Sequence, residues 1–243
     1  MTLPRRIAAE ALGSVLLTAT VVGSGIMAER LSAGNFGVAL LANTAATVAV
    51  LGVLITLLAP VSGAHFNPIV TLVMTIRGEV SWRDAGVYVA AQFAGCCAGA
   101  FLAHAMFEMP ILQASVHVRA GPAQWLAEFV ASFGLLLVIL GCRREHSVAW
   151  LVAAWIGAAY WFTSSTSFAN PAITLARSLS DTFAGIRPID VPAFAAAQLF
   201  GALAAQAVAS KLFQRDTASA TVVSPSRQLR ALITTRQTND ESQ

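Results

Sequence analysis

The sequence predicts an all-α membrane protein in which six transmembrane helices and two re-entrant half-helices form an inverted repeat. Composition is the first indication: of 243 residues, 56% are hydrophobic and only 11% are charged, whereas soluble domains carry about 25% charged residues. The second is a series of apolar runs near the length of about 20 residues that a helix needs to cross a bilayer. The third is an Asn-Pro pair inside two such regions, at Asn67-Pro68 and Asn170-Pro171.

The apolar runs define the six spans, and polar segments separate them. In chain order the spans are expected at about 7–27, 38–58, 87–107, 125–142, 148–162 and 193–213. Glu10 interrupts the first run early, which favours a retained span over a cleaved signal peptide. We expect one membrane domain over 1–213, with inverted halves of about 1–115 and 116–213. The polar segment 214–243 is predicted to be a disordered tail.

Each Asn-Pro pair predicts a loop that enters a short helix. Proline fits the first helical position but not the interior of a helix, and Asn is a favoured N-cap. The two short helices are expected at about 67–77 and 170–179, roughly half the thickness of a bilayer at about 1.5 Å per residue. Irregular backbone at membrane depth is tolerated only where protein buries it or where it lines a water-filled cavity. The two breaks therefore indicate the functional site.

The two halves repeat the same landmarks. The segments Asn67-Pro-Ile-Val-Thr-Leu72 and Asn170-Pro-Ala-Ile-Thr-Leu175 match, and Ala-Glu-x-x-x-Ser occurs at 9–14 and again at 127–132. Three spans per half is an odd number, so the second half must insert upside down relative to the first. Basic residues are more frequent on the side of the termini, which predicts that both termini are cytoplasmic.

Two half-helices that enter from opposite sides would meet at the midplane with their N-termini facing each other. Each N-terminus carries about half a positive charge, which disfavours cations but not neutral solutes. Asn67 and Asn170 would offer N–H donors there. Backbone carbonyls would line the approach; the residues expected to present them are Gly63, Ala64, His65, Ser167 and Phe168. Donors and acceptors in this order favour a pore for small neutral polar molecules.

Glu10 and Glu128 are carboxylates inside predicted spans, and two roles are open for them. They are either a proton relay, which would suit an ion-coupled secondary transporter, or structural acceptors for the N–H groups of the re-entrant loops. Their repetition together with the loops favours the structural role. His65 is likewise either a pH sensor or a packed residue that lends its carbonyl. Gln92 and Gln198 are interpreted as marks of close helix packing.

Other classes of function lack a sequence signal. The chain shows no Ser/His/Asp set, no metal-ligand cluster and no phosphate-binding loop, so we expect neither an enzyme nor a cofactor or metal. Cys96, Cys97 and Cys142 have no metal-ligand spacing. The basic residues are scattered, which argues against nucleic-acid binding. The expected partners are a small neutral solute and the lipid bilayer.

These motifs resemble those of the major intrinsic protein family, the aquaporins and glycerol facilitators, over about residues 7–213. Ser62-Gly-Ala-His-Phe-Asn-Pro68 matches the first family signature, with Ile69 in place of the usual Ala, and Asn170-Pro171-Ala172 matches the second. The resemblance implies the fold of six helices and two half-helices, one pore per subunit, a homotetramer and, in a bacterium, a location in the inner membrane. Its members are passive channels.

The resemblance also places a selectivity filter. Most members carry an Arg directly after the second signature, but here that position is Ile173; Arg177, one turn further on, is not assigned the same role. By the family's spacing the other three filter positions fall on Thr47, Ala158 and Ser167. Such a filter would have no charge and no aromatic ring, and would be wider and less polar than a water-selective one.

The run from Tyr160 to Thr174 is similar to a bacterial branch of the family that is associated with arsenic resistance and lacks the filter Arg. The implied solutes are water, glycerol-like polyols and uncharged metalloids such as arsenite, As(OH)₃, or methylated arsenicals.

Overall fold

The structure is a computed structural model, and it describes residues 1–142 and 145–213. The predicted tail, 214–243, and Arg143-Arg144 of the predicted turn before the fifth span lie outside the described residues. Met1–Leu212 forms one compact unit, and everything below concerns that unit.

The described residues fold into eight α-helices and one 3-10 turn, without strands. The helices are α1 (Leu3–Leu31), α2 (Phe36–Ser62), α3 (Pro68–Ile76), α4 (Trp82–Met106), α5 (Pro122–Gly141), α6 (Glu145–Phe162), α7 (Pro171–Ser178) and α8 (Val191–Leu212), with the 3-10 turn at Pro188–Asp190 before α8. Five of them, α1, α2, α4, α5 and α8 with its 3-10 turn, are long and apolar enough to cross a membrane, and α6 contributes a shorter apolar stretch, Val148–Phe162. The all-helical membrane fold that the sequence predicts is therefore confirmed.

Several helices extend beyond the apolar runs that predicted them. The first span was expected at 7–27, but α1 covers Leu3–Leu31. Capping side chains set other ends: Asn35 caps α2 by accepting from the Val38 N–H, and Ser81 caps α4 by accepting from the Asp84 N–H. Hydropathy reports only the part of a helix that is apolar, whereas caps and turns fix where the helix begins and ends.

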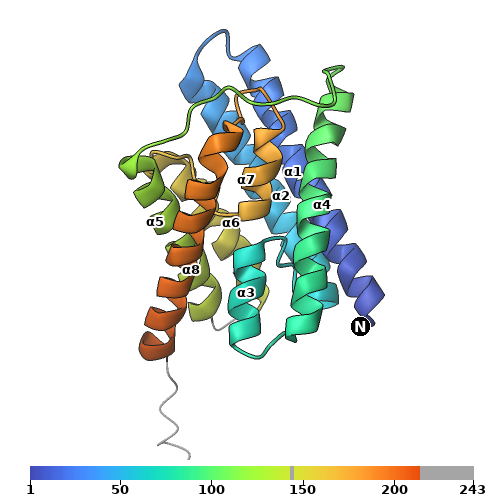
Figure 1. The fold of residues 1–243 in the computed structure, drawn as a ribbon, viewed down its shortest axis with the longest axis vertical. Helices are drawn as coiled ribbons and strands as arrows, with labels where there is room; N and C mark the ends of the chain where they lie inside the picture. Colours follow the sequence, from blue (N-terminus) through green and yellow to red (C-terminus); the bar gives the residue numbers. More distant parts are fainter. Residues whose placement is uncertain (143–144, 214–243) are drawn as a thin grey trace, which may run out of the picture. The chain divides into compact units, whose positions relative to one another are not determined.

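The half-helices α3 and α7 lie one above the other in the middle of the unit, with their N-termini facing (Figure 1). Asn67 and Asn170 are their N-caps: the Asn67 Oδ1 accepts from the Ile69 N–H at 3.1 Å and the Asn170 Oδ1 from the Ala172 N–H at 3.0 Å. Proline occupies the first helical position of both. The local chemistry of Asn-Pro therefore starts each half-helix where the sequence predicted.

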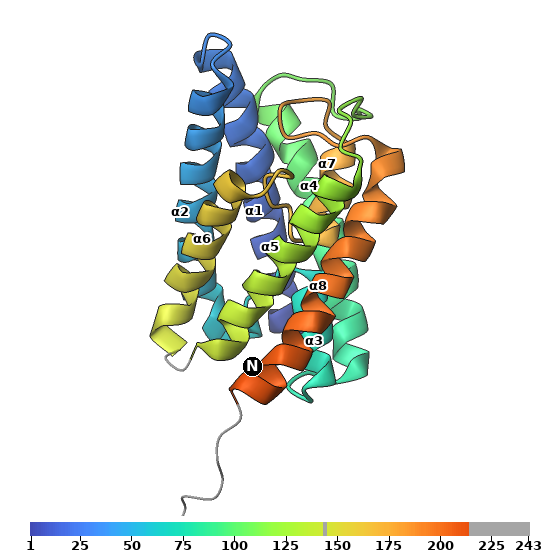
Figure 2. The ribbon, with the colours of Figure 1, turned by 90° about the vertical axis from the view of Figure 1, so that its left-hand side faces the viewer.

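The long helices surround this central pair (Figures 1 and 2). In the first half α1 packs against α2 and α4, and in the second half α5 packs against α6 and α8 in the same way. Each half-helix packs both on the third long helix of its own half and on that of the other half, because α3 contacts α4 and α8 while α7 contacts α8 and α4. The two halves are thereby interlocked around the half-helices.

The long connection 107–121 crosses the end of the unit near the C-terminal end of α7 (Figure 1). It is joined there to the segment 178–190: the Ser115 N–H donates to the Ser178 carbonyl at 3.0 Å, and the Arg187 N–H donates to the His117 carbonyl at 2.8 Å. This end, where the two connections meet, is called the loop end below.

Candidate functional site

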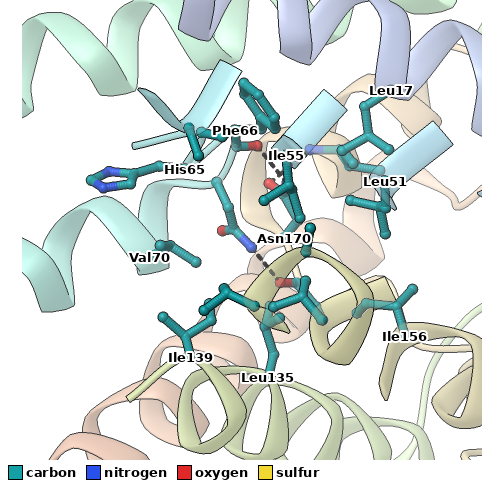
Figure 3. Close-up of a pocket in the computed structure, with 18 of the residues that line it drawn as sticks. Leu17, Leu51, Ile55, His65, Phe66, Val70, Leu135, Ile139, Ile156 and Asn170 are labelled. Carbon is teal, nitrogen blue, oxygen red and sulfur yellow. Dashed lines mark hydrogen bonds between the residues drawn. The ribbon is translucent and has the colours of Figure 1, made fainter. Parts of the chain in front are cut away.

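A cavity of about 660 Å³ contains both Asn-Pro segments. Residues of α1, α2, α5 and α6 form its wall together with the half-helices and their entry loops. Apolar side chains make up most of this wall, among them Leu17, Leu51, Ile55, Leu135, Ile139 and Ile156. Figure 3 shows them around the amide of Asn170. Polar groups in such a wall are few, so each one bears on what the cavity accepts.

The two Asn side chains fasten the entry loops to each other across the cavity. The Asn67 Nδ2 donates to the Ala169 carbonyl and the Asn170 Nδ2 donates to the Phe66 carbonyl, both at 2.8 Å. Because an amide NH₂ has two N–H groups and the Oδ1 is taken by the helix cap, each Asn keeps one fixed N–H donor. Both residues line the cavity, where these donors can serve a solute.

The entry loops have left-handed backbone at several non-glycine residues, with φ of +51° at Ala64, +47° at Phe66, +52° at Ser167 and +48° at Ala169. Left-handed conformations of this kind persist only where the surroundings fix them, and they cluster at functional sites. Gly63, Ala64, His65, Ser167 and Phe168, the residues expected to present carbonyls, all line the cavity.

Glu10 holds the first entry loop. Its carboxylate accepts from the backbone N–H groups of His65 at 3.0 Å and Phe66 at 2.7 Å, and from the Ser62 hydroxyl at 2.6 Å. The Gln92 Nε2 donates to the same carboxylate at 2.8 Å. The side chain is fully buried, so the four donors replace its hydration shell. This is the arrangement that the structural alternative describes.

Glu128 holds the second loop in the same way. It accepts from the N–H groups of Phe168 and Ala169, both at 2.9 Å, and from the Gln198 Nε2 at 2.6 Å. The Gln198 amide also donates to the Thr174 hydroxyl of α7, as Gln92 does to Thr71 of α3. The interpretation of both Gln residues as packing marks is incomplete, because they also link the acid to the half-helix. The sequence did contain a signal for this link: a Thr, Thr71 or Thr174, occurs four residues after each Asn.

His65 lies at the cavity wall, with its ring directed away from Asn170 (Figure 3). The Nδ1 is 3.1 Å from the Thr71 hydroxyl, and the ring meets Tyr88 edge-on with a centroid distance of 5.7 Å. These contacts agree with the packed alternative, and its pH-sensing role stays a prediction.

Three of the four predicted filter residues line the cavity, and one does not. Thr47, Ser167 and Ile173 are buried and face it. Ala158 is exposed on the outer side of α6, whereas Tyr160 lines the cavity with its hydroxyl 3.3 Å from the Thr47 Oγ1. The structure therefore does not place Ala158 at the cavity, and Tyr160 brings an aromatic ring to a filter that was expected to have none.

Ala158 and Tyr160 are two residues apart, which turns the side chain by about 200° around the helix, so the two cannot both face the cavity. The helical period was the better signal: Val152, Ile156 and Tyr160 recur every four residues, and all three line the cavity.

Sequence reasoning assigned no site role to two arginines at the loop end. Arg177 lines the cavity, donates from Nε to the Ala184 carbonyl and places its Cζ 3.3 Å from the centre of the Phe168 ring. Arg119 lies 4.9 Å from the centre of the same ring and donates to the carbonyls of Gly185 at 2.7 Å and Ser165 at 3.2 Å.

Burial lowers the pKa of Arg119. The contacts of Arg119 join the connections 107–121 and 178–190, and no sequence pattern predicts that these two connections meet. For Arg177 a signal existed, because it is four residues from Ile173 and so on the same face of α7.

Comparison with known proteins gives a consistent result. The family model described as Major intrinsic protein matches residues 1–163. An aquaglyceroporin, AqpS of Rhizobium meliloti, is 57% identical over 214 residues, which is 87% of this chain and 91% of that protein. Aquaporin NIP2-3 of Zea mays is 29% identical over 195 residues, 76% of this chain and 63% of that protein.

A similar fold occurs in the crystal structure of the aquaglyceroporin from Plasmodium falciparum, with a TM-score of 0.64 over 87% of this chain and 97% of that one, at 17% identity. The paired half-helices, the Asn amides that join them and the long aligned relative agree: this chain belongs to the major intrinsic protein family and is a multi-pass membrane channel rather than an enzyme.

Proposed function

We propose that the protein is a passive channel for water, glycerol-like polyols and neutral metalloids such as As(OH)₃ or methylated arsenicals. The observation that carries this proposal is the pair of Asn amides in one largely apolar cavity, each fixed by a 2.8 Å bond to the opposite loop. The remaining N–H of each amide can donate a hydrogen bond to a solute oxygen. The setting proposed for it is the inner membrane of a bacterium, with both termini cytoplasmic and four identical subunits.

Charge selection follows from the same geometry. The N-termini of α3 and α7 face each other at the cavity, so their partial positive charges add there. A cation would lose its hydration shell in an apolar wall and meet this field as well. A neutral hydroxyl compound meets neither penalty in full.

The proposed filter consists of Thr47, Tyr160, Ser167 and Ile173, and it contains no arginine. In this filter Ser167 contacts the solute. Its buried hydroxyl has no hydrogen-bond partner within the described residues, and the residue lines the cavity. Ile173 offers an uncharged aliphatic surface at the position where an arginine side chain would narrow the pore. The proposal of metalloid solutes rests on this uncharged position and on the resemblance to the arsenic-associated branch.

The test separates a channel from the alternative, an ion-coupled transporter that uses Glu10 and Glu128. The purified protein is reconstituted in liposomes, and the uptake of glycerol and of arsenite is measured with and without imposed proton and sodium gradients. We expect entry down each solute's own gradient, at a rate that the ion gradients leave unchanged. Uptake that requires a proton or sodium gradient would contradict the channel, and arsenite uptake equal to that of protein-free liposomes would contradict the metalloid solutes alone.

A further inference from the structure

We propose that Arg177 is the cation-excluding residue of the cavity, so that the charge barrier lies one helical turn from the position that sets the width. The proposal rests on the proposed function only in assuming that the cavity conducts. It assigns size selection to Ile173, and to the field of the half-helix N-termini it adds a cation barrier at a different residue of α7.

The position of Arg177 follows from the geometry of α7. Residues four apart lie on the same helix face, so Ile173 and Arg177 both line the cavity, about 6 Å apart along the axis. Because α7 begins at Pro171, after its N-cap Asn170, and runs towards the loop end, a solute that passes from the loop end meets Arg177 before Ile173.

The guanidinium is held in place at the wall. Its Nε donates to the Ala184 carbonyl, its Cζ lies 3.3 Å from the centre of the Phe168 ring, and the whole residue is 3% exposed. The Phe168 ring is itself fixed edge-on against Phe194, at a centroid distance of 5.3 Å. An aromatic ring and an arginine therefore stand together at this end of the cavity, with the charge fixed beside the path and the filter position left to Ile173.

Within the described residues, no ion pair neutralises the charge of Arg177. The three ion pairs found in the described part of the chain join Arg6 to Asp84, Arg77 to Glu79 and Arg187 to Asp190. The other charged side chain on the Phe168 ring is Arg119, which is also a cation. Two positive groups therefore act on this end of the cavity, and only Arg177 of the two lines it.

A positive charge fixed at the wall of the cavity repels a passing cation, and at the effective dielectric of a protein surface this lowers the passage of the cation by about tenfold or more. A neutral polyol instead gains N–H donors, because a guanidinium has five and here one is bound to Ala184.

The test uses the full chain reconstituted in liposomes and planar bilayers, with potassium conductance and glycerol permeability measured on the same preparation. Arg177→Gln removes the charge and Arg177→Lys retains it. Arg187→Gln is the matched control, since it removes one cation from the neighbouring connection at a side chain that is 37% exposed and paired with Asp190. Glycerol permeability above that of protein-free liposomes shows that a variant is inserted and open.

We expect potassium conductance to rise about tenfold or more in Arg177→Gln and to stay at the wild-type level in Arg177→Lys and Arg187→Gln. An inserted Arg177→Gln variant with wild-type conductance would overturn the proposal, as would an equal rise in either of the other two. Arg177→Met, which keeps the aliphatic stem over the Phe168 ring, replaces the Gln variant if the latter does not insert.

A measurement on the unmodified protein needs no variant. In a potassium chloride gradient, the reversal potential of the residual wild-type leak should have the sign expected for a leak that prefers chloride to potassium. A reversal potential of the opposite sign, which indicates preference for potassium, would contradict the assignment. Loss of the proposed function itself would give a different result, because the wild type would then conduct no glycerol.

Discussion

Ile173 is the residue on which the proposed solute range depends most. It is buried, lines the cavity and lies one turn from the fixed Arg177. In this arrangement a large solute meets an aliphatic group at the filter and a cation only further along, whereas an arginine at residue 173 would combine both functions at one level and narrow the path.

Ile173→Arg should reduce glycerol permeability about tenfold, equivalent to an added barrier of about 1.4 kcal/mol, and affect water less. The reason is that the longer side chain occupies part of the cavity that Ile173 lines, while water still passes. Light-scattering traces of proteoliposomes measure both rates. Ile173→Leu, of similar volume and no charge, is the control and should behave as the wild type. Unchanged glycerol entry in a fully inserted Arg variant would show that residue 173 is not the filter.

A substitution at Glu10 tests whether this acid has a structural role or serves as a proton relay. Glu10→Gln retains one acceptor oxygen for the N–H groups of His65 and Phe66 and adds two donors of its own, so at least one buried N–H loses its partner. We expect a loss of stability of about 1–3 kcal/mol per unsatisfied group, seen as a lower melting temperature in detergent micelles. The relay would be favoured if wild-type transport depended on a proton gradient, and if the variant lost that dependence while keeping the wild-type melting temperature.

At the residue scale, the sequence predicts the repeated polar residues well, but it predicts poorly the residues whose role depends on contacts with distant segments. Asn67, Asn170, Glu10 and Glu128 stand out because polar residues at matching places in two apolar halves have few explanations. The role of Arg119 could not be predicted, because its carbonyl partners are 46 and 66 positions away, one in the second entry loop and one in the connection 178–190.

At the scale of elements, the helices follow from hydropathy, but their contacts follow from small residues. A Cβ on Gly95 of α4 would lie 2.7 Å from the Ala11 carbonyl oxygen of α1, and one on Gly201 of α8 would strike the backbone of Phe129 in α5. The two glycines occupy matching places in the two halves. They allow each third long helix to approach the acid-bearing helix closely enough for Gln92 and Gln198 to reach Glu10 and Glu128.

Gly95→Ala should destabilise the protein by about 1–3 kcal/mol, because the methyl group meets a backbone carbonyl that cannot rotate away. Gly86 provides the control in the same helix: its added Cβ would meet nothing within 4 Å, and Gly86→Ala should be neutral or slightly stabilising. Thermal unfolding of both variants in micelles makes the comparison. Equal melting temperatures for the two would contradict close packing of α1 on α4.

Hydropathy left the ends of the elements imprecise for a physical reason. The helix α1 continues through Arg5-Arg6 before the apolar run and Glu29-Arg30 after it, because charged side chains at the ends of a span can reach the aqueous interface while the backbone stays helical. The half-helices were predicted to within a few residues, since Asn-Pro fixes their start in any surroundings.

At the scale of the whole unit, the two halves are not separate bodies. The half-helix of each half lies against the third long helix of the other, and the Asn of each loop donates to a carbonyl of the opposite loop. The cavity therefore exists only when both halves are in place. The sequence indicated this architecture through the repeat and the odd number of spans per half, although it could not show which helices exchange contacts.

Stopped-flow light scattering on proteoliposomes that contain the unmodified protein, comparing water with glycerol, tests the central claim most directly. A wide, uncharged position at Ile173 with hydroxyl groups opposite predicts glycerol entry well above that of protein-free liposomes, together with only modest acceleration of water. Fast water movement without glycerol entry would contradict this account, because it would mean that another constriction, narrower than the one formed by Thr47, Tyr160, Ser167 and Ile173, controls the cavity.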